Sequence, residues 1–136
     1  MDLGTAEQPT PSLPASCLRA QAAIACGNVK MKHVPALSDP GLTTLYLAEN
    51  EIAKIPAHTF LGLPNLEWLD LSKNKLDARG LHPHAFKDSN LISTHLENNL
   101  IDRRRIPPTA FSCIRAYHSV VLQPQQGEEE GEAEGA

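Results

Sequence analysis

Three segments of the chain repeat the same spacing of aliphatic residues. They read L-T-T-L-Y-L-A-E-N-E-I from Leu42, L-E-W-L-D-L-S-K-N-K-L from Leu66 and L-I-S-T-H-L-E-N-N-L-I from Leu91. All three fit L-x-x-L-x-L-x-x-N-x-L, and the one departure is Thr94, where leucine is expected. The copies begin 24 and 25 residues apart, a spacing typical of leucine-rich repeats. The pattern therefore predicts a short repeat solenoid.

Within each copy, the alternation of leucine with other residues predicts a short strand with one face turned inward. A single turn cannot bury its apolar residues, so successive turns stack and their strands form a parallel sheet on the concave side. Asn50, Asn74 and Asn99 follow the strands, and we expect their amides to bond backbone groups of the turn. A phenylalanine in each backing segment is expected to fill the convex side of the core: Phe60, Phe86 and Phe111.

Both ends of such a solenoid need caps, because the terminal turns would otherwise expose their apolar faces. Alternating Val29 and Met31, with Val34 nearby, predict a hairpin or single strand over the first repeat, and residues 120–122 predict a strand in the opposite cap. The expected fold class is α/β: a short leucine-rich repeat solenoid with a parallel concave sheet, an N-terminal hairpin cap and a C-terminal cap. The expected boundaries are a cap at 17–41, repeats at 42–65, 66–90 and 91–112, and a C-terminal cap at 113–125.

The two termini differ in composition from the repeats. Residues 1–16 are rich in Pro, Thr, Ser and Ala and are predicted to be a disordered leader; they lack the basic start and apolar run of a secretory signal. Residues 126–136 are predicted to be an acidic disordered tail, and its glutamates account for the formal net charge of −4. The nearly neutral remainder argues against a nucleic-acid partner. No apolar run approaches the ~20 residues that cross a bilayer.

Other candidate chemistry is sparse. His82 and His84 invite a zinc hypothesis, but no Cys or acid stands beside them at ligand spacing, so surface histidines are favoured and no metal is predicted. Cys113 and His118 are close in sequence without a third group to orient them, so we predict no catalytic residue, no cofactor and no enzyme activity. The basic run at 103–105 could contact sulfated glycans or an acidic partner, although a solvated turn is favoured.

The outward positions of the predicted sheet form the candidate binding surface. Adjacent strands lie about 4.8 Å apart, so equivalent positions of the three repeats make continuous columns. Tyr46 and Trp68 are aromatic residues beside carboxylates, a combination typical of binding hot spots. The predicted ligand-binding residues are Tyr46, Glu49, Trp68, Asp70, Lys73, His95 and Glu97.

Two further segments read C-L-R-A-Q-A-A-I-A-C-G-N-V-K from Cys17 and H-L-E-N-N-L-I-D-R-R-R-I-P-P-T-A-F-S-C-I-R-A-Y-H-S-V-V-L-Q-P-Q from His95. Together with the first two repeats, they resemble the small leucine-rich repeat proteoglycans of the extracellular matrix, most closely the podocan-like branch. The resemblance covers residues 17–125. It implies a secreted matrix protein whose partner is collagen or another secreted protein. The segment from Phe86 to Leu91 is one residue shorter than that from Phe60 to Leu66, which indicates either natural repeat variation or a junction at 87–88. Because the family has more repeats, the resemblance supports the junction and implies a shortened form lacking the middle repeats.

The cysteines depart from the family pattern, in which the N-terminal cap carries four. This chain has only Cys17 and Cys26 there: oxidising surroundings would favour a bond between them, and the cytosol would keep both reduced. The family's terminal cysteine pairs with one in a preceding repeat that this chain lacks, so Cys113 is expected to be unpaired and available for an intermolecular disulfide. Two alternatives stay open: an intracellular leucine-rich repeat adaptor, favoured by the missing export signal, and a shortened isoform with little function of its own.

Overall fold

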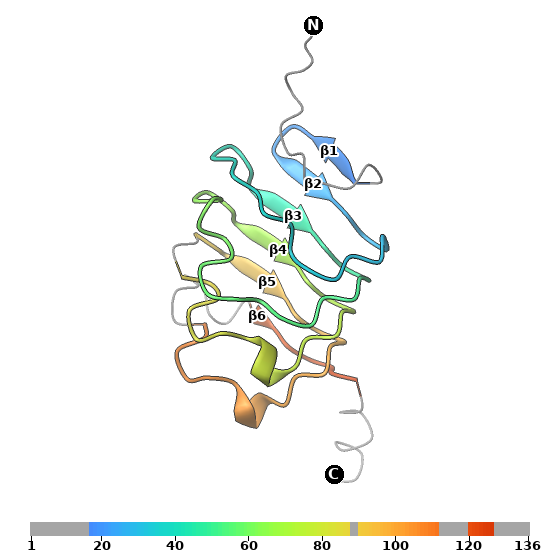
Figure 1. Ribbon diagram of the computed structural model, residues 1–136, viewed down its shortest axis with the longest axis vertical. Coiled ribbons are helices and arrows are strands. Elements are labelled where there is room, and N and C mark those ends of the chain that lie inside the picture. The colour runs from blue at the N-terminus through green and yellow to red at the C-terminus, as the bar shows by residue number, and fades with distance from the viewer. Residues whose placement is uncertain (1–16, 88–89, 112–119, 127–136) are drawn as a thin grey trace, which may run out of the picture.

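The computed structural model describes residues 17–87, 90–111 and 120–126 of the chain. These residues form a stack of turns with one open six-stranded sheet along a single side (Figure 1). The first two strands pair antiparallel, and each later strand pairs parallel with its neighbour in the chain. The strands are β1 (Leu18–Ala20), β2 (Ala23–Ala25), β3 (Thr44–Tyr46), β4 (Trp68–Asp70), β5 (Ser93–His95) and β6 (Val120–Val121). The predicted solenoid with a parallel sheet is confirmed.

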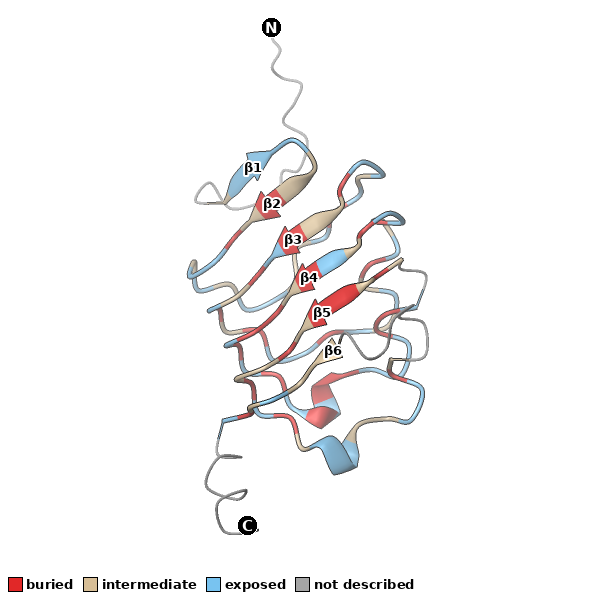
Figure 2. Cartoon of the chain, turned by 180° about the vertical axis from the view of Figure 1, so that it is seen from behind, coloured by how far each residue is buried: buried red, intermediate tan, exposed pale blue. Residues whose placement is uncertain are grey.

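The register of the sheet follows the sequence repeat. Leu45 in β3 pairs with Leu69 in β4, which pairs with Thr94 in β5. All three are buried. Figure 2 shows buried segments in β3, β4 and β5, and on β3 and β4 they lie beside more exposed positions. Because side chains alternate between the two faces of a strand, the residues on either side of these three belong to the opposite, concave face.

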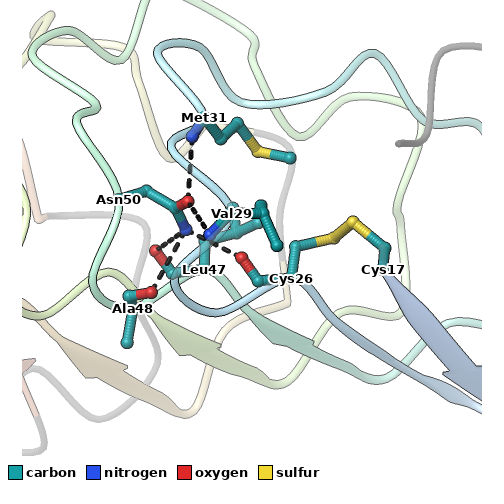
Figure 3. Close-up of a disulfide and its surroundings, with 7 residues drawn as sticks. All are labelled: Cys17, Cys26, Val29, Met31, Leu47, Ala48 and Asn50. Atoms are coloured by element: carbon teal, nitrogen blue, oxygen red, sulfur yellow. Dashed lines mark hydrogen bonds between the residues drawn. A yellow bond between two sulfur atoms is a disulfide. The ribbon is translucent and has the colours of Figure 1, made fainter. Parts of the chain in front are cut away.

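Buried amide side chains run down the stack, one for each repeat: Asn50, Asn74 and Asn99. For Asn74, Nδ2 donates to the carbonyl oxygens of Leu47 and Leu71 at 2.9 and 3.1 Å. Its Oδ1 accepts the N–H of Ile52 at 3.0 Å. The amide thus links its own turn to the preceding one, and Asn50 does the same for the first turn (Figure 3). The bonding expected of these asparagines is confirmed.

Gln125 continues this ladder at the C-terminal end. Its Oε1 accepts the N–H groups of Asn99 and Ile101 at 3.1 and 2.9 Å. Its Nε2 donates to the carbonyl oxygens of Leu96 and Leu122. Residues 120–125 therefore form the strand and ladder of a further turn, which the sequence predicted only as a cap strand.

The side of the core away from the strands is filled by the expected phenylalanines. The rings of Phe60 and Phe86 stack with centroids 5.9 Å apart, and those of Phe86 and Phe111 lie 5.8 Å apart. In the described residues, helix is limited to two short 3-10 turns, η1 (Ala78–Gly80) and η2 (Arg103–Arg105). The helical part of the α/β fold is therefore small.

The N-terminal cap is a hairpin. β1 and β2 pair antiparallel, and β2 pairs parallel with β3, so the hairpin joins the sheet directly. A disulfide joins Cys17, just before β1, to Cys26, just after β2. Figure 3 shows this bond beside the first ladder asparagine, whose amide nitrogen donates to the Cys26 carbonyl.

The position expected for the cap strand, at Val29, Met31 and Val34, is wrong. These residues follow the hairpin in irregular backbone, and Lys30 between them has a φ of 61°, which a strand does not accommodate. The N–H groups of Val29 and Met31 donate instead to Oδ1 of Asn50. Their side chains pack partly buried against the core. The alternation that predicted a strand thus reflects packing in a turn.

At the other end, β6 holds Val120 and Val121, and Leu122 lies just beyond the strand. Cys113, the leader at 1–16 and the tail after Gln126 lie outside the described residues, as does Asp88 of the expected junction. Among the described residues, no helix is long and apolar enough to span a membrane.

Candidate protein-binding surface

The two exposed aromatic residues predicted for the concave face lie on adjacent strands. Tyr46 ends β3 and Trp68 begins β4, and they are 47% and 49% exposed. Tyr46 pairs in register with Asp70, and Trp68 with Thr44. The two rings therefore occupy neighbouring columns of the same face, on a sheet held from behind by the buried leucines.

The carboxylate beside these rings is held in place by its own strand end. Asp70 Oδ1 accepts the backbone N–H of Ser72 at 3.0 Å and its hydroxyl at 2.7 Å. Ser72 is itself buried. The repeat pattern does not point to Ser72, although an aspartate often bonds the backbone two residues further on, and the D-x-S spacing could have indicated this contact. The arrangement presents Asp70 to the concave face with few rotamers left to lose on binding.

Polar groups continue along the same columns on β5. Asp70 pairs in register with His95. The His95 Nδ1 lies 3.6 Å from Oε1 of Glu97, and its Nε2 lies 3.4 Å from the Ser93 hydroxyl. His95 is partly exposed, whereas Oε1 of Glu97 is inaccessible to solvent. The structure thus brings these two predicted residues together as a pair.

Glu49 and Lys73 lie at the rim of the surface. Each precedes a ladder asparagine and has left-handed backbone, with φ values of 61° and 57°. The Lys73 Nζ lies 3.8 Å from Oε2 of Glu49, and both side chains are more than half exposed. Exposed pairs of this kind contribute little to stability, so both charges remain available to a ligand.

Three histidines outside the sheet, His58, His82 and His84, lie close together. The rings of His58 and His84 stack with centroids 6.3 Å apart, and His82 lies 5.7 Å from His84. The Nδ1 of His82 accepts the backbone N–H of His84 at 2.9 Å. The lone pair of that nitrogen is therefore used in a hydrogen bond and cannot bind a metal at the same time. Across residues 17–87, 90–111 and 120–126, no group of three His, Cys, Asp or Glu side chains is placed to hold a metal ion.

Comparison with known proteins agrees with this architecture. A family model described as "Leucine rich repeat" matches residues 40–101. Prolargin from Rattus norvegicus is 42% identical over 62 residues, which are 46% of this chain and 16% of prolargin. Podocan from Mus musculus is 38% identical over 74 residues, 54% of this chain and 12% of podocan. Lumican from Coturnix japonica is 31% identical over 111 residues, 80% of this chain and 32% of lumican.

The chain therefore spans less than a fifth of the prolargin and podocan relatives and about a third of lumican. All three relatives are small leucine-rich proteoglycans. The in-register sheet, the amide ladder and these likenesses give one result: the chain has a leucine-rich repeat fold and is similar to the small leucine-rich proteoglycans.

Proposed function

We propose that the chain is a non-enzymatic extracellular-matrix protein that binds collagen or another secreted protein on its concave sheet. The observation that carries this proposal is the pair Tyr46 and Trp68, each about half exposed on adjacent strands. Large aromatic side chains offer much contact area for few rotatable bonds, and they are enriched among the residues that dominate binding energy. A rigid sheet supports them without a loss of backbone entropy on binding.

The charges around these rings favour a ligand with basic side chains. Asp70 lies in the same column as Tyr46, and Glu97 lies further along the face beyond His95. A lysine or arginine of the ligand could meet a carboxylate and an aromatic face together, and cation–π contacts add about 0.5–2 kcal/mol. Lys73 and Glu49 at the rim would then set orientation more than affinity.

Two observations support an extracellular setting over the intracellular adaptor. The relatives are matrix proteoglycans, and Cys17 is bonded to Cys26, as is expected in an oxidising compartment. Mass spectrometry after thiol blocking of the protein from cells tests this point. We expect Cys17 and Cys26 to escape the blocking reagent, and quantitative labelling of both would favour the adaptor.

The binding surface is tested by retention of the chain on fibrillar collagen. We expect the Tyr46→Ala/Trp68→Ala variant to bind at least about tenfold more weakly, which corresponds to about 1.4 kcal/mol. The matched control is Leu61→Ala/Leu100→Ala, which removes two exposed apolar side chains that lie outside the strands. This control should bind like the unaltered chain.

Each other outcome removes a part of the proposal. Equal retention of the aromatic variant and the unaltered chain would remove the concave face as the binding surface. If the unaltered chain is not retained, collagen is not the ligand. An equal loss in the control variant would show that adhesion comes from exposed apolar groups in general.

A further inference from the structure

A basic ridge lies outside the sheet, where the chain leaves the ladder in each repeat; its cations are Lys54, Arg79, Arg103, Arg104 and Arg105. The two 3-10 turns that carry its arginines contact each other and are drawn one below the other in Figure 1. Each turn begins at an aspartate whose side chain accepts a backbone N–H of the turn, Asp77 from Gly80 and Asp102 from Arg104. The capped turns fix where the arginine side chains begin.

The ridge borders a depression of about 460 Å³. Lys54, Arg79 and Arg105 line it, together with His82 and three prolines. These cations come from three successive turns of the solenoid, one from each. They therefore follow one another along the stacking direction, and a long ligand lying in the depression would meet each of them.

Two carboxylates, Asp77 and Asp102, lie in the same region, but they do not neutralise the positive charge of the ridge. Asp102 is bonded to Arg104, and its second oxygen lies 3.6 Å from Nε of Arg105. Asp77 accepts the N–H of Gly80. Among the described residues, Lys54 and Arg79 have no ion-pair partner. Even without Arg103, four cations (Lys54, Arg79, Arg104 and Arg105) stand against these two carboxylates, so this part of the described chain has a positive excess.

We propose that this ridge binds a linear sulfated polysaccharide, independently of the protein ligand of the concave face. Guanidinium groups present paired N–H donors that match the oxygens of sulfate and carboxylate groups, and a regular polyanion offers them at repeated intervals. The exposed aromatic residues of the described chain, Tyr46 and Trp68, lie on the sheet rather than on the ridge. The ridge therefore lacks the stacking platform that single-stranded nucleic acids use.

The test measures binding to heparin as a function of NaCl concentration. Each ionic contact adds about one to the slope of log Kd against log salt, by counterion release. The Arg79→Gln/Arg105→Gln variant should lose about one to two from this slope and bind several-fold more weakly at physiological salt. The charge-matched control Lys32→Gln/Lys87→Gln, whose lysines are exposed and do not line the depression, should keep the slope of the unaltered chain.

A single variant, Lys54→Gln, guards against misfolding of the double variant and should lose about one from the slope. Equal losses in the ridge and control variants would overturn the proposal, because they would show attraction by total charge alone. Undiminished binding of the ridge variants would overturn it as well.

Polyglutamate that binds the ridge as tightly as heparin would assign the ridge to an acidic peptide instead. Unsulfated hyaluronan should bind far more weakly, and equal binding would contradict the role of sulfate.

Discussion

The residues that stabilise the solenoid most specifically are the buried amides of the ladder. Asn99, for example, donates to the carbonyls of Leu71 and Leu96 and accepts the N–H of Leu76. A buried backbone group without a hydrogen-bond partner costs about 1–3 kcal/mol. Because one asparagine bonds several backbone groups of two successive turns, it removes several of these costs. The repeat predicted these asparagines. It did not predict Gln125, because glutamine replaces asparagine there and the spacing from Asn99 is 26 residues.

Thr94 is the one residue of the strand pattern that places a polar group in the apolar core. It replaces leucine in the middle of β5, is completely buried, and its Oγ1 has no hydrogen-bond partner among the described residues. Thr94→Val keeps the shape and removes the buried hydroxyl, so we expect it to raise the free energy of unfolding by about 1 kcal/mol. Urea denaturation checks this. A loss of stability would show that the hydroxyl has a partner.

Asp39 gives the fold a local sensitivity to acid. Burial raises the pKa of its carboxyl, but hydrogen bonds from the Arg19 guanidinium and the Gly41 N–H outweigh this effect and hold the pKa below its ordinary value of 3.8. A depressed pKa in the folded state means that the stabilising contribution is present above the ordinary pKa. It is lost as the pH falls through the folded-state value.

An NMR titration of the Asp39 carboxyl carbon follows this directly. The midpoint should lie below 3.8 and should rise in Arg19→Gln, because the salt bridge to Arg19 is removed. The control is Lys32→Gln, which removes a charge close to Asp39 in sequence and leaves the Arg19–Asp39 salt bridge in place. An unchanged midpoint in Arg19→Gln would show that Arg19 does not set the pKa.

At the scale of elements, the strands were predictable and the 3-10 turns were not. The strand register follows the repeat: Thr44, Trp68 and Ser93 occupy equivalent positions of the three copies and pair with one another in the sheet. The first 3-10 turn arises where the chain is longer than in the first repeat. Leu81 follows Leu76 by five positions, whereas Ile55 follows Ile52 by three, so the second repeat has two additional residues here. An apolar pattern does not reveal how such an insertion folds, and the capping aspartates indicate it only afterwards.

Gly80 shows how tightly the first of these turns is held. Its carbonyl accepts the N–H of Ile55 at 2.7 Å, and a Cβ built on Gly80 would lie 2.1 Å from the carbonyl oxygen of Ala53. Gly80→Ala should therefore lower the free energy of unfolding by more than about 2 kcal/mol, because backbone must move.

Gly41→Ala is the matched control, since a Cβ at Gly41 would meet only Asp39 Oδ1 at an ordinary 3.5 Å. Its free energy of unfolding should stay within about 0.5 kcal/mol of that of the unaltered chain. Thermal or urea denaturation of both variants makes the comparison. Equal stabilities would mean that the turn around Gly80 is looser than its contacts indicate.

At the scale of the whole molecule, the stack carries two separate surfaces. The aromatic concave face is built on the strands, and the basic ridge is built on the turns that follow the ladder. The fold was predictable because each turn buries its residues against the next by the same local rule. The candidate site was predictable only as columns of residues. Its restraints, such as the Ser72 bonds to Asp70, depend on side-chain geometry that the repeat does not specify.

The central claim is that the repeats form one continuous hydrogen-bonded sheet, and native-state hydrogen exchange tests it most directly. The amides of Leu47, Leu71 and Leu96 donate to the carbonyls of Asp70, His95 and Val121 on the next strand, each at 2.8 Å. We predict that all three exchange only through opening of the whole stack, with similar free energies close to that of global unfolding. Exchange of these amides at the rate of an unstructured chain would contradict the solenoid and both surfaces built on it.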